Sequence, residues 1–222
     1  MNNENPDRQV GVFILHRIER MNIQDINNSF GDMDMFLMDA LLKGYAPEGS
    51  SVLDAGCGPG RNLLYFLQRD YQLFVADKDE NEVRLVQFMA KNFNKKLTAV
   101  TADLMELPMA SASVDFIVCS RVLHFAEGRA SFFRMLNELK RVLRRGGILY
   151  LSMASRIGMA SFVRADGAEK HRFPDGSIRF MLDEHLLTEI LGHWAQMEPN
   201  RTVRFDDMSC ETTLLLRNSS AT

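Results

Sequence analysis

The spacing of the apolar residues along the chain changes near residue 50. Before it, apolar residues recur at helical spacing over residues 11–21 and 33–43, which predicts two amphipathic helices within residues 1–45. After it, short and almost purely apolar runs alternate with longer amphipathic segments. Five of these runs are predicted strands: residues 51–55, 72–76, 97–101, 114–119 and 148–153.

Amphipathic segments between the strands predict helices over residues 61–69, 82–93 and 130–145. Strands that are apolar nearly throughout and alternate with helices are typical of a parallel sheet covered on both faces. A further helix over residues 182–194 precedes two more strands, 202–205 and 211–216. Their short link excludes a parallel crossover. We therefore expect a doubly wound α/β fold with a seven-stranded, mostly parallel sheet and a C-terminal antiparallel hairpin.

Length and composition narrow the class of protein. The 222 residues, 46% of them hydrophobic, fit a single domain over residues 1–222 without a linker. The net charge of −3 disfavours nucleic acid or an anionic membrane as partner. Three scattered cysteines and the histidine spacing indicate neither disulfides nor a metal site, and no apolar run reaches the length of a membrane span. These features predict a cytoplasmic protein.

The first predicted strand carries the clearest motif. It contains Asp54 and runs into a G-x-G-x-G turn formed by Gly56, Gly58 and Gly60. Glycines in such a turn adopt positive φ and let a ligand approach the backbone closely. The second strand leads to Asp77, at the spacing where an acid reaches a pair of ribose hydroxyls. Taken alone, Asp77 would also suit a turn or helix cap.

Two later strands also lead into polar residues. Asp103 follows the third strand and is either a ligand contact or a loop cap. Residues 120–124, from Ser120 to His124, follow the fourth strand. His124 has a side chain suited to acid–base work near neutral pH, and a substrate contact or a histidine packed under the next helix are the alternatives.

Residues 52–62, with the sequence VLDAGCGPGRN, resemble motif I of the class I S-adenosylmethionine-dependent methyltransferases, and residues 114–125 resemble their motif IV. The resemblance extends over residues 51–216. It includes RVLRRGG at 141–147, similar to the family's entry to the fifth strand, with Arg145 where proline is usual. Within the family, Gly60-Arg61-Asn62 together with Ala76-Asp77-Lys78 is similar to the tellurite-resistance and thiopurine-like small-molecule methyltransferases.

The resemblance implies S-adenosylmethionine as cofactor and a small-molecule acceptor of the methyl group. It places Asp77 on the cofactor ribose, Asp103 on the adenine amine, and His124 beside the transferred methyl as the candidate catalytic residue. Residues 156–181 become an insertion on the acceptor side. The full set of implied cofactor-binding residues is Asp54, Gly56, Cys57, Gly58, Gly60, Asp77, Lys78, Asp103, Leu104 and Ser120.

Two alternatives remain at this stage. An NAD(P)-dependent oxidoreductase also uses an acid after the second strand, but its fingerprint is G-x-G-x-x-G, and Arg61 stands where its last glycine belongs. A catalytically silent cofactor-binding domain would share the fold, since fold alone does not establish activity. Such a domain has no need of an accessible pocket around residues 120–124.

Overall fold

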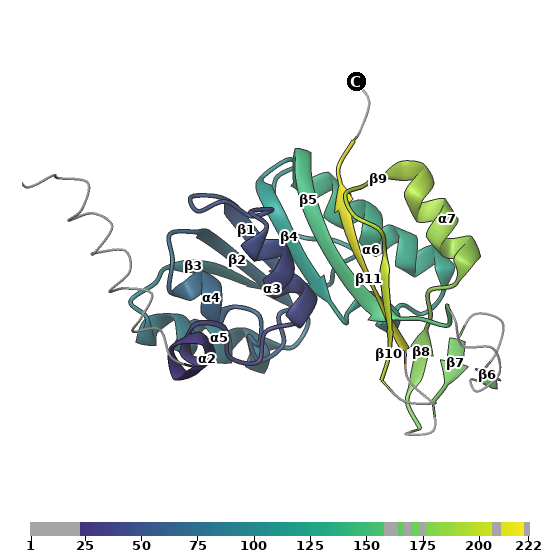
Figure 1. The fold of residues 1–222 in the computed structure, drawn as a ribbon, viewed down its shortest axis with the longest axis horizontal. Helices are drawn as coiled ribbons and strands as arrows, with labels where there is room; N and C mark the ends of the chain where they lie inside the picture. The colour runs from purple at the N-terminus through teal and green to yellow at the C-terminus, as the bar shows by residue number, and fades with distance from the viewer. Residues whose placement is uncertain (1–22, 158–163, 167–169, 174–175, 206–209, 220–222) are drawn as a thin grey trace, which may run out of the picture.

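The computed structural model describes residues 23–157, 164–166, 170–173, 176–205 and 210–219, so the helix predicted over residues 11–21 lies outside the described part. One large sheet runs in the order β10-β11-β5-β4-β1-β2-β3 (Figure 1). Its strands are β1 (Ser51–Ala55), β2 (Gln72–Asp77), β3 (Leu97–Thr101), β4 (Val114–Ser120), β5 (Leu143–Ala154), β10 (Arg201–Arg204) and β11 (Cys210–Arg217).

The pairing confirms the predicted fold class. Strands β1 to β5 pair in parallel, whereas β11 pairs antiparallel with both β5 and β10. A two-residue strand that the sequence did not predict, β9 (Ala195–Gln196), also pairs with β11. The chain leaves β1 toward β2 and β3 and then returns to β4 on the other side of β1. This reversal of strand order leaves a crevice at the carboxyl ends of β1 and β4.

Helices cover both faces of the sheet. Successive residues of β1 point to opposite sides: Val52 packs in one buried cluster with residues of α3, α4 and α5, and Leu53 packs in another with residues of α6 and α7. The helices are α2 (Ile23–Phe30), α3 (Met35–Leu42), α4 (Leu64–Leu67), α5 (Glu80–Asn92), α6 (Arg129–Val142) and α7 (Glu184–His193), and the 3-10 turn η1 spans Leu123–Phe125.

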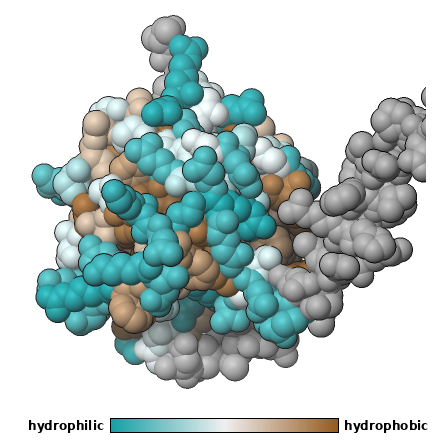
Figure 2. Space-filling view, turned by 90° about the vertical axis from the view of Figure 1, so that its left-hand side faces the viewer, coloured by the Kyte–Doolittle hydropathy of each residue, from teal (hydrophilic) through white to brown (hydrophobic). Residues whose placement is uncertain are grey.

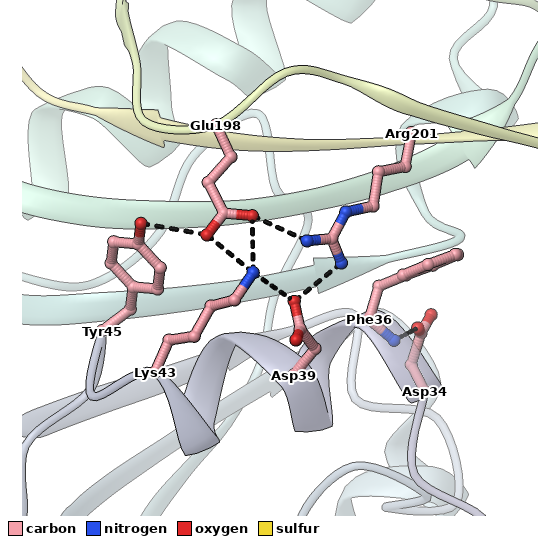
Figure 3. Close-up of polar contacts among 7 residues, drawn as sticks. All are labelled: Asp34, Phe36, Asp39, Lys43, Tyr45, Glu198 and Arg201. Carbon is pink, nitrogen blue, oxygen red and sulfur yellow. Dashed lines mark hydrogen bonds and ion pairs between the residues drawn. The ribbon is translucent and has the colours of Figure 1, made fainter.

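A cluster of four charged side chains holds α3 to the C-terminal hairpin (Figure 3). Lys43 lies 2.8 Å from Asp39 and 2.9 Å from Glu198, and Arg201 lies 2.7 Å from each of the same two carboxylates. Tyr45 donates to Glu198 at 3.1 Å. The two acids and two bases alternate, so each charge has two opposite neighbours.

The other end of α3 is fixed to the ligand-binding side of the sheet. Asp34 caps the helix by accepting from Phe36 N at 3.0 Å, and its second carboxylate oxygen accepts from Ser120 Oγ at 3.3 Å (Figure 3 shows the cap). Asn62, just after the glycine turn, accepts from Asp34 N at 3.1 Å. Helix α3 therefore links the hairpin, the end of β4 and the glycine turn.

Helix α6 ends earlier than predicted, at Val142 instead of Arg145. Leu143 adopts an extended conformation, is buried, and pairs with Val114 at the start of β5. Arg144 leaves the helix end to bind Asp115 at 2.7 Å. The buried apolar side chain of Leu143 fits the sheet, and only Lys140 and Arg141 remain in the last helical turn.

One other prediction needs correction, and two features were not predicted. The helix expected over residues 61–69 is reduced to α4, because the chain from Gly60 to Leu63 forms a hydrogen-bonded turn first. Helix α2 was not predicted, and its Asn and Ser residues have a low helix propensity. The insertion at 156–181 contains a small antiparallel sheet of β6 (Arg164–Asp166), β7 (Lys170–Arg172) and β8 (Ile178–Phe180). This sheet lies beside the carboxyl end of β5 (Figure 1).

The surface at the β3 end of the molecule is mainly hydrophilic, with hydrophobic residues visible between the polar ones (Figure 2). On α5, Leu85 and Phe88 are exposed. Within the described residues, every helix is too short or too polar to cross a lipid bilayer.

Candidate active site

The glycine turn after β1 has the backbone geometry that its sequence predicts. Gly56, Gly58 and Gly60 all have positive φ, at 76°, 48° and 83°. A Cβ atom on Gly56 would lie 2.4 Å from a methyl carbon of Val122, whereas one on Gly58 would meet no atom within 4 Å. Gly56 is therefore required for packing, and Gly58 faces open space.

Gly60 and Cys57 belong to the same turn but pack against the protein interior. A Cβ atom on Gly60 would lie 2.5 Å from the terminal methyl of Met89, so this glycine permits contact with α5. Cys57 is buried, and burial raises the pKa of its thiol well above the usual range, which keeps it neutral. Neither residue lines the cavity in front of the turn.

That cavity has a volume of about 360 Å³ and lies at the carboxyl ends of the central strands. It brings together seven of the ten residues predicted to bind the cofactor, from four separate loops: Gly56, Gly58, Asp77, Lys78, Asp103, Leu104 and Ser120. The predicted crevice is thus a real cavity, and its walls come from the ends of β1, β2, β3 and β4.

Asp77 contacts both the glycine turn and its own loop. One carboxylate oxygen accepts from Gly58 N at 2.8 Å, and the other accepts from Asp79 N at 3.0 Å. A carboxylate oxygen can accept more than one hydrogen bond, so both still have capacity for a ligand. Asp103 is similar: one oxygen accepts from Met105 N at 2.8 Å, as in the loop cap that was the alternative reading.

Asp54 is the most unusual acid of the site. It is only 3% exposed, and its Oδ2 atom makes no hydrogen bond among the described residues. Burial, and secondarily the negative charge of Asp77, raise the pKa of Asp54 to about 7. A buried carboxylate oxygen without a hydrogen-bond partner is costly. A ligand with a positive charge near the glycine turn would supply that partner, so these residues fit a cationic cofactor.

Ser120 joins the cavity to the N-terminal helices. Its hydroxyl donates to Asp34, accepts from Arg61 Nη2 at 3.2 Å and lies 3.1 Å from Ser152 Oγ. Arg61, which replaces the last glycine of a dinucleotide fingerprint, is thus directed at the end of β4.

His124 does not line this cavity but a second one, of about 440 Å³. The side chain is buried, and its Nδ1 accepts from Ala154 N at a long 3.4 Å. Burial, then the charges of Arg179 and Arg121, lower the pKa of His124 to about 4. His124 is therefore neutral near pH 7, with its proton on Nε2.

The two cavities share Arg121 and Phe125 as lining residues. Phe173 and Arg179 of the second cavity come from the 156–181 insertion, and Lys170 of β7 lies 2.6 Å from Glu127 of the first. Glu211 and Phe205 come from the hairpin. The sequence did not single out Phe173, Arg179, Phe205 and Glu211, because they come from distant segments. Arg121 lies within residues 120–124, the segment after the fourth strand that the sequence did single out.

Comparison with known proteins identifies the domain. Residues 53–151 match the family model described as a methyltransferase domain. This domain belongs to the S-adenosylmethionine-dependent methyltransferases. A probable S-adenosylmethionine-dependent methyltransferase of Mycobacterium tuberculosis is 36% identical over 108 residues, covering 48% of this chain and 36% of the relative. A putative methyltransferase of Encephalitozoon cuniculi is 31% identical over 136 residues, covering 60% of this chain and 59% of the relative.

The chain thus spans from about a third to three fifths of the length of these relatives. Solved methyltransferase structures share the fold. The 1,6-didemethyltoxoflavin-N1-methyltransferase of Burkholderia thailandensis, with bound 1,6-didemethyltoxoflavin and S-adenosylhomocysteine, superposes with a TM-score of 0.64 at 18% identity, covering 99% of this chain and 93% of its own. TehB of Haemophilus influenzae superposes with a TM-score of 0.63 at 20% identity, covering 82% of this chain and 62% of TehB.

Among the described residues, no three or more His, Cys, Asp or Glu side chains are grouped to hold a metal ion. The three cysteines are free and buried.

Proposed function

We propose that the protein transfers the methyl group of S-adenosylmethionine to a small-molecule acceptor in the cytoplasm. The observation that carries this proposal is the pair of adjoining cavities, of which the first collects the predicted cofactor residues and the second contains His124. A silent cofactor-binding domain has no need of the second cavity. The buried, reduced cysteines fit the proposed compartment.

In the proposed cofactor site, Asp77 binds the ribose hydroxyls and Asp103 the adenine amine, with the backbone N–H of Leu104 on the ring. Gly56 and Gly58 let the chain approach the methionine part, with Lys78 at the rim and Ser120 at the β4 end. The ionised Asp54 offsets the positive charge of the cofactor. Cys57 and Gly60 maintain the shape of the turn without lining the cavity. When bound, S-adenosylmethionine supplies a methyl group that its positively charged sulfur already activates.

The chain's own task on the acceptor side is to position a nucleophile and exclude water. We propose His124 as the catalytic residue there, in a specific role. Because Nδ1 of His124 accepts from Ala154 N, Nε2–H is a hydrogen-bond donor, and because the pKa is low the imidazole is a weak base at best. His124 would orient the acceptor, and the acceptor's proton would leave to solvent.

Two measurements test this function. Calorimetry should show S-adenosylhomocysteine binding in the micromolar range and no NAD binding. Transfer of labelled methyl from S-adenosylmethionine to a panel of small metabolites should then yield at least one acceptor. Binding of NAD without S-adenosylhomocysteine would favour the oxidoreductase. Tight S-adenosylhomocysteine binding with no acceptor in a broad panel of metabolites would favour the silent domain.

A further inference from the structure

The second cavity has a composition suited to one kind of acceptor. Three aromatic side chains line it, and two of them, Phe125 and Phe205, are each 59% exposed. Phe173, the third, is buried. Large aromatic side chains that stay open to solvent inside a concave site mark a surface for binding apolar or aromatic groups.

Arg121 stands where this cavity meets the cofactor cavity. Its Nε donates to Glu211 at 2.7 Å, and its guanidinium carbon lies 5.9 Å from the centre of the Phe205 ring. Among the described residues, its two terminal nitrogens make no hydrogen bond. The side chain is 45% exposed, whereas that of Glu211 is only 14% exposed. Arg121 therefore keeps a forked pair of donors open toward a ligand.

The backbone of Arg121 is strained in a way that fits this role. Its φ is 62°, in the left-handed region that side chains other than glycine rarely adopt. The strain is held by the bond from Arg121 N to Ser152 O at 2.8 Å, which ties the loop to β5. Strained residues at the end of a strand concentrate at functional sites.

The charges around the cavity favour an anion. Glu211 and Arg121 are paired, so these two charges offset each other, and the lining carries one more guanidinium than carboxylate. Arg179, stacked 4.8 Å from the Phe173 ring, adds a second guanidinium to the lining. A guanidinium with two parallel N–H groups matches the geometry of a carboxylate better than that of a phenol or an amide.

We propose that Arg121 determines acceptor specificity and that the acceptor is an aromatic carboxylate, with its ring packed among Phe125, Phe173 and Phe205. This inference rests on the proposed function and narrows its acceptor to one chemical class. The carboxylate binds the open edge of Arg121, and the nucleophilic atom is another substituent of the same ring system. The three phenylalanines contact the ring of the acceptor. Arg121 binds its carboxylate and therefore favours an aromatic acid over a neutral analogue.

The test uses matched pairs of aromatic acids and their amides, such as hydroxybenzoates, aminobenzoates and quinolinecarboxylates. Binding of each is measured by calorimetry to the full chain saturated with S-adenosylhomocysteine. We expect at least one acid to bind at least tenfold more tightly than its amide. Arg121→Gln should reduce that ratio to about one, and Arg121→Lys should restore part of it. Because the ratio is taken within one protein preparation, a fraction of unfolded variant does not change it.

Arg84→Gln, on the exposed face of α5 where the arginine pairs with Glu80, is the matched control and should leave the ratio unchanged. Amides that bind as tightly as acids would overturn the proposal, as would an acid preference that survives Arg121→Gln. So would an Arg121→Gln protein that loses S-adenosylhomocysteine affinity but keeps the preference, which would assign Arg121 to the cofactor. Failure of every pair to bind while S-adenosylhomocysteine binds would reject the aromatic carboxylate and leave the proposed function standing.

Discussion

Asp77 and Gly58 are joined by a hydrogen bond of 2.8 Å from the glycine N–H to the carboxylate. The bond connects the end of β2 to the middle of the glycine turn, so the proposed ribose-binding acid also fixes the loop that faces the cofactor. The other carboxylate oxygen of Asp77 accepts a hydrogen bond from Asp79 N and so fixes the start of the next loop. Asp77 is thus both a structural residue and a proposed ligand contact, and its two roles can be separated by substitution.

Asp77→Ala should weaken S-adenosylhomocysteine binding at least tenfold while the domain remains folded. The alanine removes charge-assisted hydrogen bonds worth about 1.5–3 kcal/mol each, and it also frees the Gly58 N–H. Asp77→Asn is the control, because its amide oxygen can still accept from Gly58. Its loss of affinity should be smaller. Unchanged affinity in Asp77→Ala, measured by calorimetry, would reduce this acid to a loop cap.

The two glycines of the turn should respond differently to the same change. Gly56→Ala forces a Cβ atom against Val122 and should destabilise the domain by more than about 2 kcal/mol, lowering Tm by roughly 4–8 °C. Gly58→Ala has the backbone cost of about 1–2 kcal/mol but no clash. It should stay folded and still lose cofactor affinity, because its methyl group enters the cavity. Thermal unfolding and calorimetry on both variants check this, and a Gly58→Ala protein with normal affinity would contradict it.

The sheet and most of the residues that line the first cavity were predictable because each depends on local pattern. The buried strands, the positive-φ glycines and the acids at strand ends are dictated within windows of about ten residues. The end of α6 was missed because Leu143 has two uses: its side chain suits a helix, but burial against β4 favours the strand. Local pattern does not rank these two options.

The acceptor side was less predictable, because its residues meet only in three dimensions. Arg121 and Glu211 are 90 positions apart and become a pair only when β11 inserts beside β5. The buried state of His124 was one of the alternatives in the sequence, yet its low pKa depends first on burial and then on the charge of Arg179 from the insertion. Contacts between distant segments of this kind decide substrate chemistry and leave no periodic signal.

Asp54 should make cofactor binding depend on pH. Since its pKa is raised to about 7, the carboxyl group is mostly protonated at pH 6 and mostly ionised at pH 8. If the ionised form offsets positive charge on the ligand, S-adenosylmethionine affinity should increase by up to about tenfold across this interval. Asp54→Asn should bind weakly at both pH values. An equal pH dependence in the variant would place the responsible group elsewhere.

Asp54 and His124 should also have opposite effects on the stability of the ligand-free protein. The folded-state pKa of Asp54 is raised from 3.8 to about 7, so its contribution to stability is lost as pH increases through that range. The folded-state pKa of His124 is lowered from 6.5 to about 4, so its contribution is lost as pH decreases through that range. As the pH rises from 4 to 7, the free energy of unfolding of Asp54→Asn should therefore increase relative to that of the wild type. Over the same interval, the free energy of unfolding of His124→Gln should decrease relative to that of the wild type. Urea titrations at several pH values measure both differences.

His124→Ala tests the catalytic proposal most directly. A histidine with a pKa of about 4 and its Nδ1 bonded to Ala154 N donates one neutral hydrogen bond to the acceptor, worth about 0.5–1.5 kcal/mol. Removing it should lower kcat by roughly two- to tenfold, with no new dependence on pH between 5 and 8, and S-adenosylhomocysteine affinity should barely change. His124→Gln keeps an acceptor for Ala154 N and separates this loss from disturbance of β5. A general base would behave differently: its removal should cost about 10²–10⁴-fold and abolish a limb of the pH–rate profile. That result would show that ligand binding raises the pKa of His124 far above its value in the free protein, and the orienting role would have to be abandoned.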